Sequence, residues 1–387
     1  MTYRAHRAAF WAAAMTCALV PAARAEIAVS ANDGKQVLED GVAKVPATVV
    51  PDTVSFIDMS ASPPKVIAEI EAPTTVVGPP SAVAVAPDES FAIVTGGMAL
   101  DPSDKTKMVP DDKVSVIDLK ASPPKVIATH QAGKGVAGVS INRAGTLAIV
   151  ANRNEGTVSV FSIKGNVLTP VGDKIRLGDE KSAPAGIAFA RDGSAAYVSR
   201  DGDNRISVLA IAGDKVEYTR RDLYAGMRPY GIDATGAGDV AAVANIGLGF
   251  GDQDTISLID IKAKPARVVT TVSVGQTPEG LKMSPDGRYV AVGVMNGSNK
   301  PKASPFYGPK GALQIWEIKG HDLAKVAEAP IGVWCQGIVW SKDGRKLVAQ
   351  CMADRQMISF SFDGTKLAQT GIIETKNGPA SIRTAEP

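Results

Sequence analysis

The sequence has few of the side chains that hold metals, haem or redox centres. Its 387 residues include only three cysteines and three histidines, and no Cys-x-x-Cys-His segment occurs. Metal and haem sites are built largely from Cys, His and carboxylate side chains at short, regular spacings. We therefore expect no metal centre and no other cofactor.

The sequence also has no excess of charge of one sign. It carries 42 Lys and Arg against 40 Asp and Glu, without a basic run. Domains that bind nucleic acid concentrate basic residues on one face, because phosphate contacts dominate their affinity. We therefore expect no nucleic acid as a partner.

Two common catalytic signatures are missing as well. The sequence contains no Gly-x-Ser-x-Gly segment, which presents a nucleophilic serine, and no phosphate-binding P-loop pattern. Hydrolysis by a serine nucleophile therefore has no residue in this sequence to which we can assign it.

Long apolar runs are confined to the N-terminus. Residues 1–25 start with two arginines in the first seven positions, continue with the apolar stretch 8–20 and end in Ala23-Arg24-Ala25. This order is typical of a secretory signal peptide, and the apolar stretch is shorter than the roughly 20 residues that a spanning helix needs. We predict cleavage after Ala25, a periplasmic or secreted protein, and no membrane span.

What the sequence does have is a repeated pattern of strands. The stretch 184–211 contains three runs of strand-forming residues, separated by an Asp-Gly turn and a second polar turn, which is typical of an antiparallel meander. Further copies start at Pro80, Val136, Pro229, Pro278 and Cys335. A period of about 40–50 residues with several short strands per repeat indicates a β-propeller.

The two ends of the chain complete a seventh copy. Residues 379–384 match the first strand of a repeat, whereas 27–32, 53–58 and 65–71 match the second, third and fourth. A blade built from both ends closes the ring and leaves no free sheet edge. We therefore predict an all-β fold, in which residues 26–387 form one seven-bladed β-propeller domain of four-stranded antiparallel blades.

The loops between second and third strands differ in length. They are short in three blades and long in four, at 33–52, 97–112, 246–254 and 295–311. In a propeller these loops share one face with the links between blades, and long loops on a rigid scaffold are where binding residues gather. We expect a protein or small-molecule partner at this loop-rich face. The alternative is that the long loops are only solvent-exposed and bind nothing.

Several segments resemble the YVTN-type repeat, namely Val150-Ala151-Asn152, Tyr197-Val198-Ser199, Ser284-Pro285-Asp286-Gly287 and Val116-Ile117-Asp118. The resemblance covers most of the chain after residue 25. It implies a WD40-like exported seven-bladed propeller of the kind found in surface-layer proteins, which is similar to lactonase-type propellers. Lactonase-type propellers tend to show Pro-Arg-His entering a first strand. Here the matching triplets are Pro229-Tyr230-Gly231 and Pro278-Glu279-Gly280, without histidine.

The residues at the start of each first strand differ among the copies. Blades four to six carry every large or ionisable group there: Arg228, Tyr230, Glu279, Trp334 and Gln336. A cation, an acid, an aromatic face and two hydrogen-bonding tips are the mixture expected of a small-molecule pocket. We predict that these five side chains form one wall of a ligand site at the channel mouth. The alternative is that Arg228 and Glu279 neutralise each other and Trp334 only packs.

Two of the cysteines, Cys335 and Cys351, flank one hairpin. Counting outward from the turn Asp343-Gly344 places Cys335 opposite Met352, so a bulge of one residue would bring the two cysteines face to face. Directly opposed residues have Cβ atoms about 4.5–5.5 Å apart, close to the distance that a disulfide needs. Because exported compartments are oxidising, we predict a disulfide. Two free, half-buried cysteines are the alternative.

The function that these observations favour is that of an exported binding or scaffold protein, which holds a ligand at the channel mouth without chemistry of its own. A lactonase-like hydrolase stays open as an alternative, with Glu279 as acid/base and Arg228 holding an anionic group. An accessory subunit of a periplasmic redox system is a third hypothesis, by fold analogy alone. We therefore favour a binding protein over an enzyme, and the sequence names no ligand.

Overall fold

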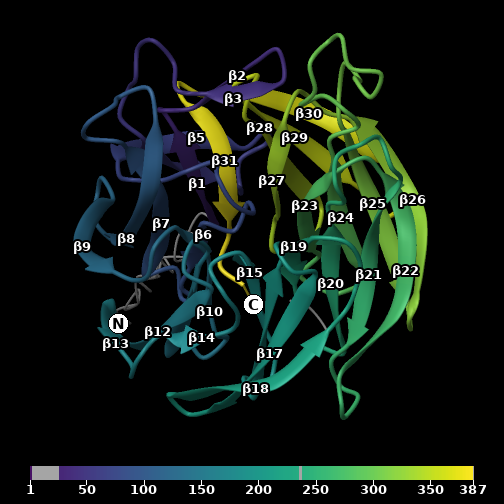
Figure 1. Ribbon diagram of the computed structural model, residues 1–387. Coiled ribbons are helices and arrows are strands. Elements are labelled where there is room, and N and C mark those ends of the chain that lie inside the picture. The colour runs from purple at the N-terminus through teal and green to yellow at the C-terminus, as the bar shows by residue number, and fades with distance from the viewer. Residues whose placement is uncertain (2–25, 235–237, 387) are drawn as a thin grey trace.

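The computed structural model describes residues 1, 26–234 and 238–386, so nearly all of the predicted signal segment 1–25 lies outside the described residues. The described chain contains no helix and forms seven four-stranded antiparallel sheets, which stand as blades around a central channel (Figure 1). The predicted all-β fold with seven blades is confirmed.

Each blade uses four strands that follow one another outward from the channel. Blade one consists of β6 (Val83–Val85), β7 (Phe91–Leu100), β8 (Met108–Asp118) and β9 (Lys125–Gln131). Blade two consists of β10 (Val136–Ile141), β11 (Leu147–Asn152), β12 (Thr157–Lys164) and β13 (Val167–Pro170), with the short β14 (Ile175–Arg176) also paired to β12. Blade three consists of β15 (Pro184–Phe189), β16 (Ala195–Arg200), β17 (Arg205–Ala212) and β18 (Lys215–Leu223).

Blade four consists of β19 (Pro229–Asp233), β20 (Val240–Asn245), β21 (Asp254–Asp260) and β22 (Arg267–Gly275). Blade five consists of β23 (Pro278–Met283), β24 (Tyr289–Val294), β25 (Ala312–Lys319) and β26 (Asp322–Pro330). Blade six consists of β27 (Cys335–Trp340), β28 (Lys346–Cys351), β29 (Gln356–Phe362) and β30 (Leu367–Glu374). Blade seven consists of β31 (Gly378–Arg383), β1 (Ile27–Asp33), β4 (Thr53–Asp58) and β5 (Lys65–Glu71).

The burial of each strand follows from its place in the blade. Second strands are almost entirely buried, and β11 is buried at every position, because each blade packs between two neighbours. Fourth strands such as β9 are largely exposed. The apolar clusters join adjacent blades, as where Phe91 of blade one and Phe161 of blade two share one cluster. Small Val, Ile and Ala side chains therefore fill the thin layers between sheets.

Blade seven closes the ring in the way that the sequence predicts. Strand β1 pairs with β31 on one side, with Val29 opposite Arg383, and with β4 on the other. The first strand of this blade is Gly378–Arg383, one residue earlier than predicted. Backbone hydrogen bonds between the two ends of the chain therefore hold the propeller shut.

The tight turns between first and second strands confirm the register of the repeats. The glycines in these turns have positive φ angles between 67° and 87°, at Gly145, Gly193, Gly238, Gly287 and Gly344. Glu89 takes the same place in blade one with a φ of 54°, which is a costlier conformation for a residue with a Cβ atom.

Two of the segments predicted as long loops contain strands. The segment 33–52 includes the hairpin of β2 (Val37–Glu39) and β3 (Val42–Lys44). In 97–112, strands β7 and β8 continue to Leu100 and from Met108, so only 101–107 is a loop. Gly97 and Pro110 lie in this segment, and both residue types weaken strands, but a register shift between Gly96 and Met98 lets the ladder continue.

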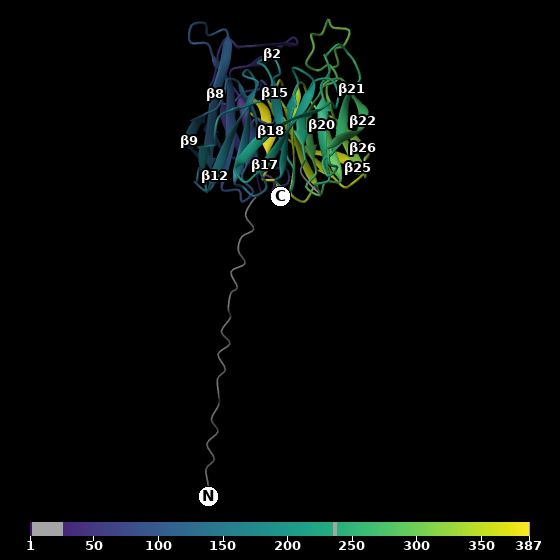
Figure 2. The same ribbon diagram turned by 60° about the horizontal axis from the view of Figure 1, so that its bottom comes forward.

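The long insertions gather on one face of the ring, as predicted. Figure 2 shows β2 and the loop before β25 on the same face, with the C-terminal end on the opposite face. The backbone N–H of Lys302 donates to Asp40 Oδ1 at 2.9 Å, so the insertion of blade seven touches that of blade five. We call the channel opening on this face the channel mouth.

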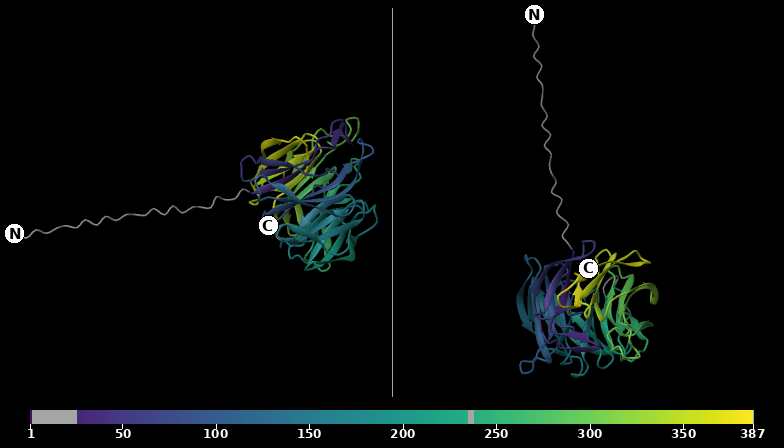
Figure 3. Two further views of the ribbon diagram at one scale, coloured as in Figure 1. Left: turned by 90° about the vertical axis from the view of Figure 1, so that its left-hand side faces the viewer. Right: turned by 90° about the horizontal axis from the view of Figure 1, so that it is seen from above.

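The opposite end of the channel is closed by the last residues of the chain. After β31, Ala385 forms a parallel bridge with Val85 of blade one, and Glu386 forms an ion pair with Lys282 of blade five. Lys282 Nζ also lies 3.1 Å from Asp233 Oδ1 of blade four. The end of the chain accordingly lies near the centre of the ring in Figure 1, and two side views are given in Figure 3.

Deleting residues 378–387 should abolish cooperative folding, because it removes β31 and leaves β1 as an open sheet edge. Deleting only 384–387 is the matched control, since it keeps every strand of blade seven. Thermal denaturation followed by circular dichroism compares the two. A sharp, unshifted transition in the longer deletion would contradict ring closure by β31.

Candidate functional site

The channel mouth is lined by residues that backbone bulges place at the start of the first strands. In blade four, Pro229 pairs with Asn245 and Ile232 with Val243, so two residues, Tyr230 and Gly231, face one on the partner strand. Blades two, three, five and six show the same kind of register shift. Because a bulge re-aims the side chains beside it, one side chain per blade is directed to the mouth.

The residue before the first strand has an unusual backbone in five of the seven blades. Its φ angle is between 49° and 66° in five blades, at Gly135, Ala183, Arg228, Thr277 and Trp334. For residues other than glycine such a conformation costs about 1–3 kcal/mol of free energy. Residues strained in this way cluster at ligand sites. In blades four to six these strained positions hold large or polar side chains.

Two arginines at the mouth share one buried carboxylate. Arg153 binds both oxygens of Asp201, and Arg228 Nη2 lies 3.0 Å from Asp201 Oδ2. The Asp201 side chain is only 2% exposed, whereas that of Arg228 is 36% exposed. The guanidinium of Arg153 also lies over the ring of Tyr230, 5.7 Å from its centroid. The cluster therefore carries one positive charge more than Asp201 neutralises.

Glu279 lies beside this cluster with a perturbed acidity. Its Oε2 accepts a hydrogen bond from Gln336 Nε2 at 2.6 Å. Burial raises the pKa of the Glu279 carboxyl to about 7, while the hydrogen bond from Gln336 and the nearby Arg228 oppose part of this rise. Near neutral pH the carboxyl is thus poised between its neutral and charged forms.

The structure brings four of the five predicted wall residues into one region of the mouth. Arg228, Tyr230, Glu279 and Gln336 are linked through the contacts above. Arg228 forms its ion pair with Asp201, and among the described residues it forms none with Glu279, although its charge lowers the pKa of the Glu279 carboxyl. Trp334 packs instead against the apolar cluster that contains Val76, Met352 and Ala380.

Sequence reasoning missed Arg153 and Asp201. Each is the first residue after a second strand, a position held by Ile246, Met295 and Met352 in blades four to six. The backbone N–H at this position bonds to the residue before the first strand, as from Arg153 to Gly135 O at 2.9 Å. A comparison of the residue that follows the second strand in each repeat would have found both Arg153 and Asp201.

Two buried polar atoms at the mouth have no hydrogen-bond partner among the described residues. They are Gln336 Oε1 and Ser81 Oγ, on side chains of residues that are 3% and 6% exposed. Leaving such a group unpaired costs about 1–3 kcal/mol, so bound water or the hydrogen-bond donors of a ligand are expected there.

Within the described residues, no three His, Cys, Asp or Glu side chains are grouped as metal ligands. In the same part of the chain there is no helix long and apolar enough to cross a membrane.

The structure contains a disulfide between Cys335 and Cys351, with the sulfur atoms 2.04 Å apart. The two residues are direct partners in the ladder of β27 and β28, and the register shifts between Cys335 and Ile338. This shift is the bulge that facing cysteines require. The bridge lies next to Trp334 at the mouth of blade six.

Comparison with known proteins supports the fold and goes no further. No family model matches the sequence, and no curated protein matches it. Solved structures do match, among them a putative 6-phosphogluconolactonase from Bacteroides uniformis, with a TM-score of 0.69 and 16% identity over 93% of this chain and 100% of that one. The periplasmic gluconolactonase from Pseudomonas aeruginosa has a TM-score of 0.63 and 17% identity over 93% and 100%.

A third match is a functionally unknown protein from Desulfotomaculum acetoxidans, with a TM-score of 0.69 and 16% identity over 94% of this chain and 99% of that one. At such identities the likeness shows a shared propeller architecture. The class of protein that the fold defines is thus a seven-bladed β-propeller whose structural neighbours include lactonase-like proteins. The shared fold does not transfer a function to this chain.

Replacing Glu279 by Gln should change how stability depends on pH. The folded state holds the proton that the unfolded chain releases near pH 4.5, so wild-type stability falls as the pH rises from about 4.5 through 7. Relative to the wild type, Glu279→Gln should gain up to about 3 kcal/mol between pH 5 and pH 8. Thermal melts across this range measure the gain. The exposed Glu39→Gln is the control, and parallel pH curves for wild type and Glu279→Gln would refute a raised pKa.

The disulfide predicts a specific mass-spectrometric result. Without reduction, the purified protein that lacks residues 1–25 should take up no alkylating reagent, and after reduction it should take up two. Replacing both Cys335 and Cys351 by Ala should cost at most about 3 kcal/mol, because the bridge closes a short loop of 16 positions. Two reactive thiols before reduction would contradict the bridge.

Proposed function

We propose that this chain is an exported YVTN-like β-propeller that binds a small anionic ligand at the channel mouth. The observation that carries the proposal is the pair of guanidinium groups, Arg153 and Arg228, around the single carboxylate of Asp201. When Glu279 is protonated, this cluster keeps one uncompensated positive charge. A carboxylate or phosphate on the ligand would supply the missing negative charge at the partly exposed Arg228.

The rest of the ligand should carry hydroxyl groups. Gln336 Oε1 and Ser81 Oγ are buried and lack a partner, so they favour a ligand that can donate hydrogen bonds. Sugar acids and their lactones combine these hydroxyls with an anionic or polar group. We therefore infer that a small polyhydroxylated acid or lactone is the class of ligand that fits the mouth.

Hydrolysis of a lactone is the second candidate function, and one observation favours it. A carboxyl with a pKa of about 7 is well suited to act as a general base at neutral pH. In its ionised form Glu279 would take a proton from the water that attacks the lactone carbonyl, while Arg228 holds the anionic group. The structural neighbours described as gluconolactonases share the fold on which this site is built.

Export is part of the proposal. The basic and then apolar residues 1–25, which end in Ala23-Arg24-Ala25, support cleavage after Ala25, and the disulfide suits an oxidising compartment. The likeness in fold to a protein described as periplasmic agrees with this.

A thermal-shift screen of the chain without residues 1–25 tests the proposal. Sugar acids and lactones should raise the melting temperature, because a ligand that binds only the folded state stabilises it. Arg228→Ala should weaken binding of the best ligand about tenfold or more, since it removes a charge-assisted hydrogen bond at an exposed site. The same ligands incubated with the protein and analysed for ring opening separate binding from hydrolysis.

Arg221→Ala is the matched control for Arg228→Ala, because it removes an exposed arginine whose side chain donates to Ala266 O outside the mouth. Glu279→Gln should abolish any hydrolysis while the fold is kept. Equal binding by wild type and Arg228→Ala would show that the arginine cluster is only structural.

A further inference from the structure

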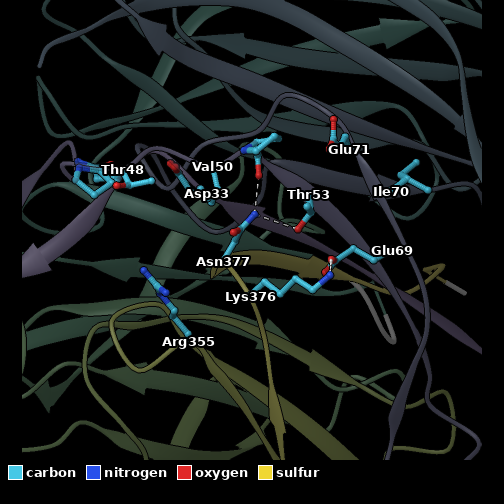
Figure 4. A pocket seen from close by; sticks show the side chains of 14 residues that line it. Asp33, Thr48, Val50, Thr53, Glu69, Ile70, Glu71, Arg355, Lys376 and Asn377 are labelled. Atoms are coloured by element: carbon cyan, nitrogen blue, oxygen red, sulfur yellow. Dashed lines mark hydrogen bonds and ion pairs between the residues drawn. The ribbon is translucent and has the colours of Figure 1, made fainter. Parts of the chain in front are cut away.

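A cavity lies between blades six and seven, apart from the charged cluster at the channel mouth. It has a volume of about 640 Å³, which is within the range of cavities that hold small molecules. Its lining comes from the insertion 33–52, from β5, from the turn before β29 and from the link to β31 (Figure 4). None of the mouth residues described above lines it, so it is a separate site.

Arg355 is the residue that points to a ligand in this cavity. Its side chain extends into the cavity and makes no ion pair or side-chain hydrogen bond within the described residues (Figure 4). Two of the three acids that line the cavity are already engaged, because Asp33 accepts from the backbone of Lys35 and Val76, and Glu69 accepts from Ser55. Arg355 therefore offers an uncommitted guanidinium to whatever occupies the cavity.

The backbone at Arg355 adds a second, independent observation. Arg355 is the last residue of a four-residue turn and has a φ of 53°. The same place in the equivalent turns of blades two and three is held by Gly156 and Asn204, with φ angles of 72° and 60°. Glycine and asparagine adopt this conformation readily, whereas a long side chain does so at a cost. The strained backbone therefore occurs where the positively charged side chain of Arg355 lines the cavity.

A buried acceptor without a partner lines the same cavity. Gln36 is 8% exposed, and its Oε1 has no hydrogen bond within the described residues. Another part of the lining is held by hydrogen bonds, since Asn377 Nδ2 donates to Pro51 O at 2.8 Å and to Thr53 Oγ1 at 3.3 Å. A rigid site with a free cation and a free acceptor calls for a ligand with an anion and a hydrogen-bond donor.

Apolar groups complete the lining. Pro46, Val50 and Ile70 line the cavity with the polar residues above. We propose that this cavity binds a small α-amino or α-hydroxy acid with an apolar side chain. The carboxylate pairs with Arg355, the α-ammonium or α-hydroxyl donates to Gln36 Oε1, and the apolar side chain lies against Val50 and Ile70. This inference does not depend on the function proposed for the channel mouth.

Isothermal titration calorimetry with matched ligands tests the proposal on the chain that lacks residues 1–25. L-Leucine and 2-hydroxyisocaproate carry both the carboxylate and an α-donor, whereas isocaproate lacks the donor and isoamylamine lacks the carboxylate. At least one of the first two should bind, and the last two should bind at least tenfold more weakly. The tighter of the first pair identifies the donor as ammonium or hydroxyl.

Two substitutions connect binding to the named side chains. Arg355→Asn introduces the residue that the turn of blade three already has, so the fold should be kept while affinity falls at least tenfold. Gln36→Met keeps the size of the side chain and should lower affinity several-fold. Glu279→Gln at the channel mouth is the control and should leave this binding unchanged. The proposal is overturned if neither acid binds, or if Arg355→Asn and Gln36→Met both bind as tightly as the wild type.

Discussion

The propeller depends on how closely its seven first strands approach one another at the channel mouth. At Gly138 a Cβ atom would lie 2.2 Å from Ala185 O of the next blade, and at Gly280 it would lie 2.2 Å from Gln336 O. Neither position has room for a side chain. The glycine at each of them therefore allows the first strands of neighbouring blades to approach this closely. The hydroxyl of Ser199 donates to Tyr230 O at 2.5 Å and ties blade three to blade four in the same layer.

This close approach also limits the chemistry of the mouth. In blades two to six, which have this glycine, the first strand offers one side chain at the opening, and the residues before the first strand and after the second strand can each offer one more. Arg153 and Asp201 use the position after the second strand, whereas Tyr230, Glu279 and Gln336 use the one on the first strand. The charged cluster is therefore assembled from several blades, and each blade contributes only one or two groups to it.

Most of the fold could be predicted from the sequence because it repeats a local pattern. Turn glycines such as Gly193 and Gly287 mark the hairpins, and the copy split between residues 27–32 and 379–384 indicates the closure by β1 and β31. The site was harder to predict, because the contacts of Arg153 and Asp201 join different blades and have no short-range signature. Backbone strain at Arg228 and Arg355 depends on the folded turn, so it too is visible only in the structure.

The pairing of Val29 with Arg383 means that the two ends of the described propeller run side by side within one sheet. The ring is therefore nearly cyclic, and the order of its blades along the chain is one of seven that would give the same arrangement in space. A circularly permuted chain, opened in one of the exposed turns between first and second strands and joined near residues 26 and 385, would keep every blade sheet. In such a chain Ala385 and Glu386, which now contact blades one and five at the end opposite the mouth, would belong to an internal link and not to a chain end.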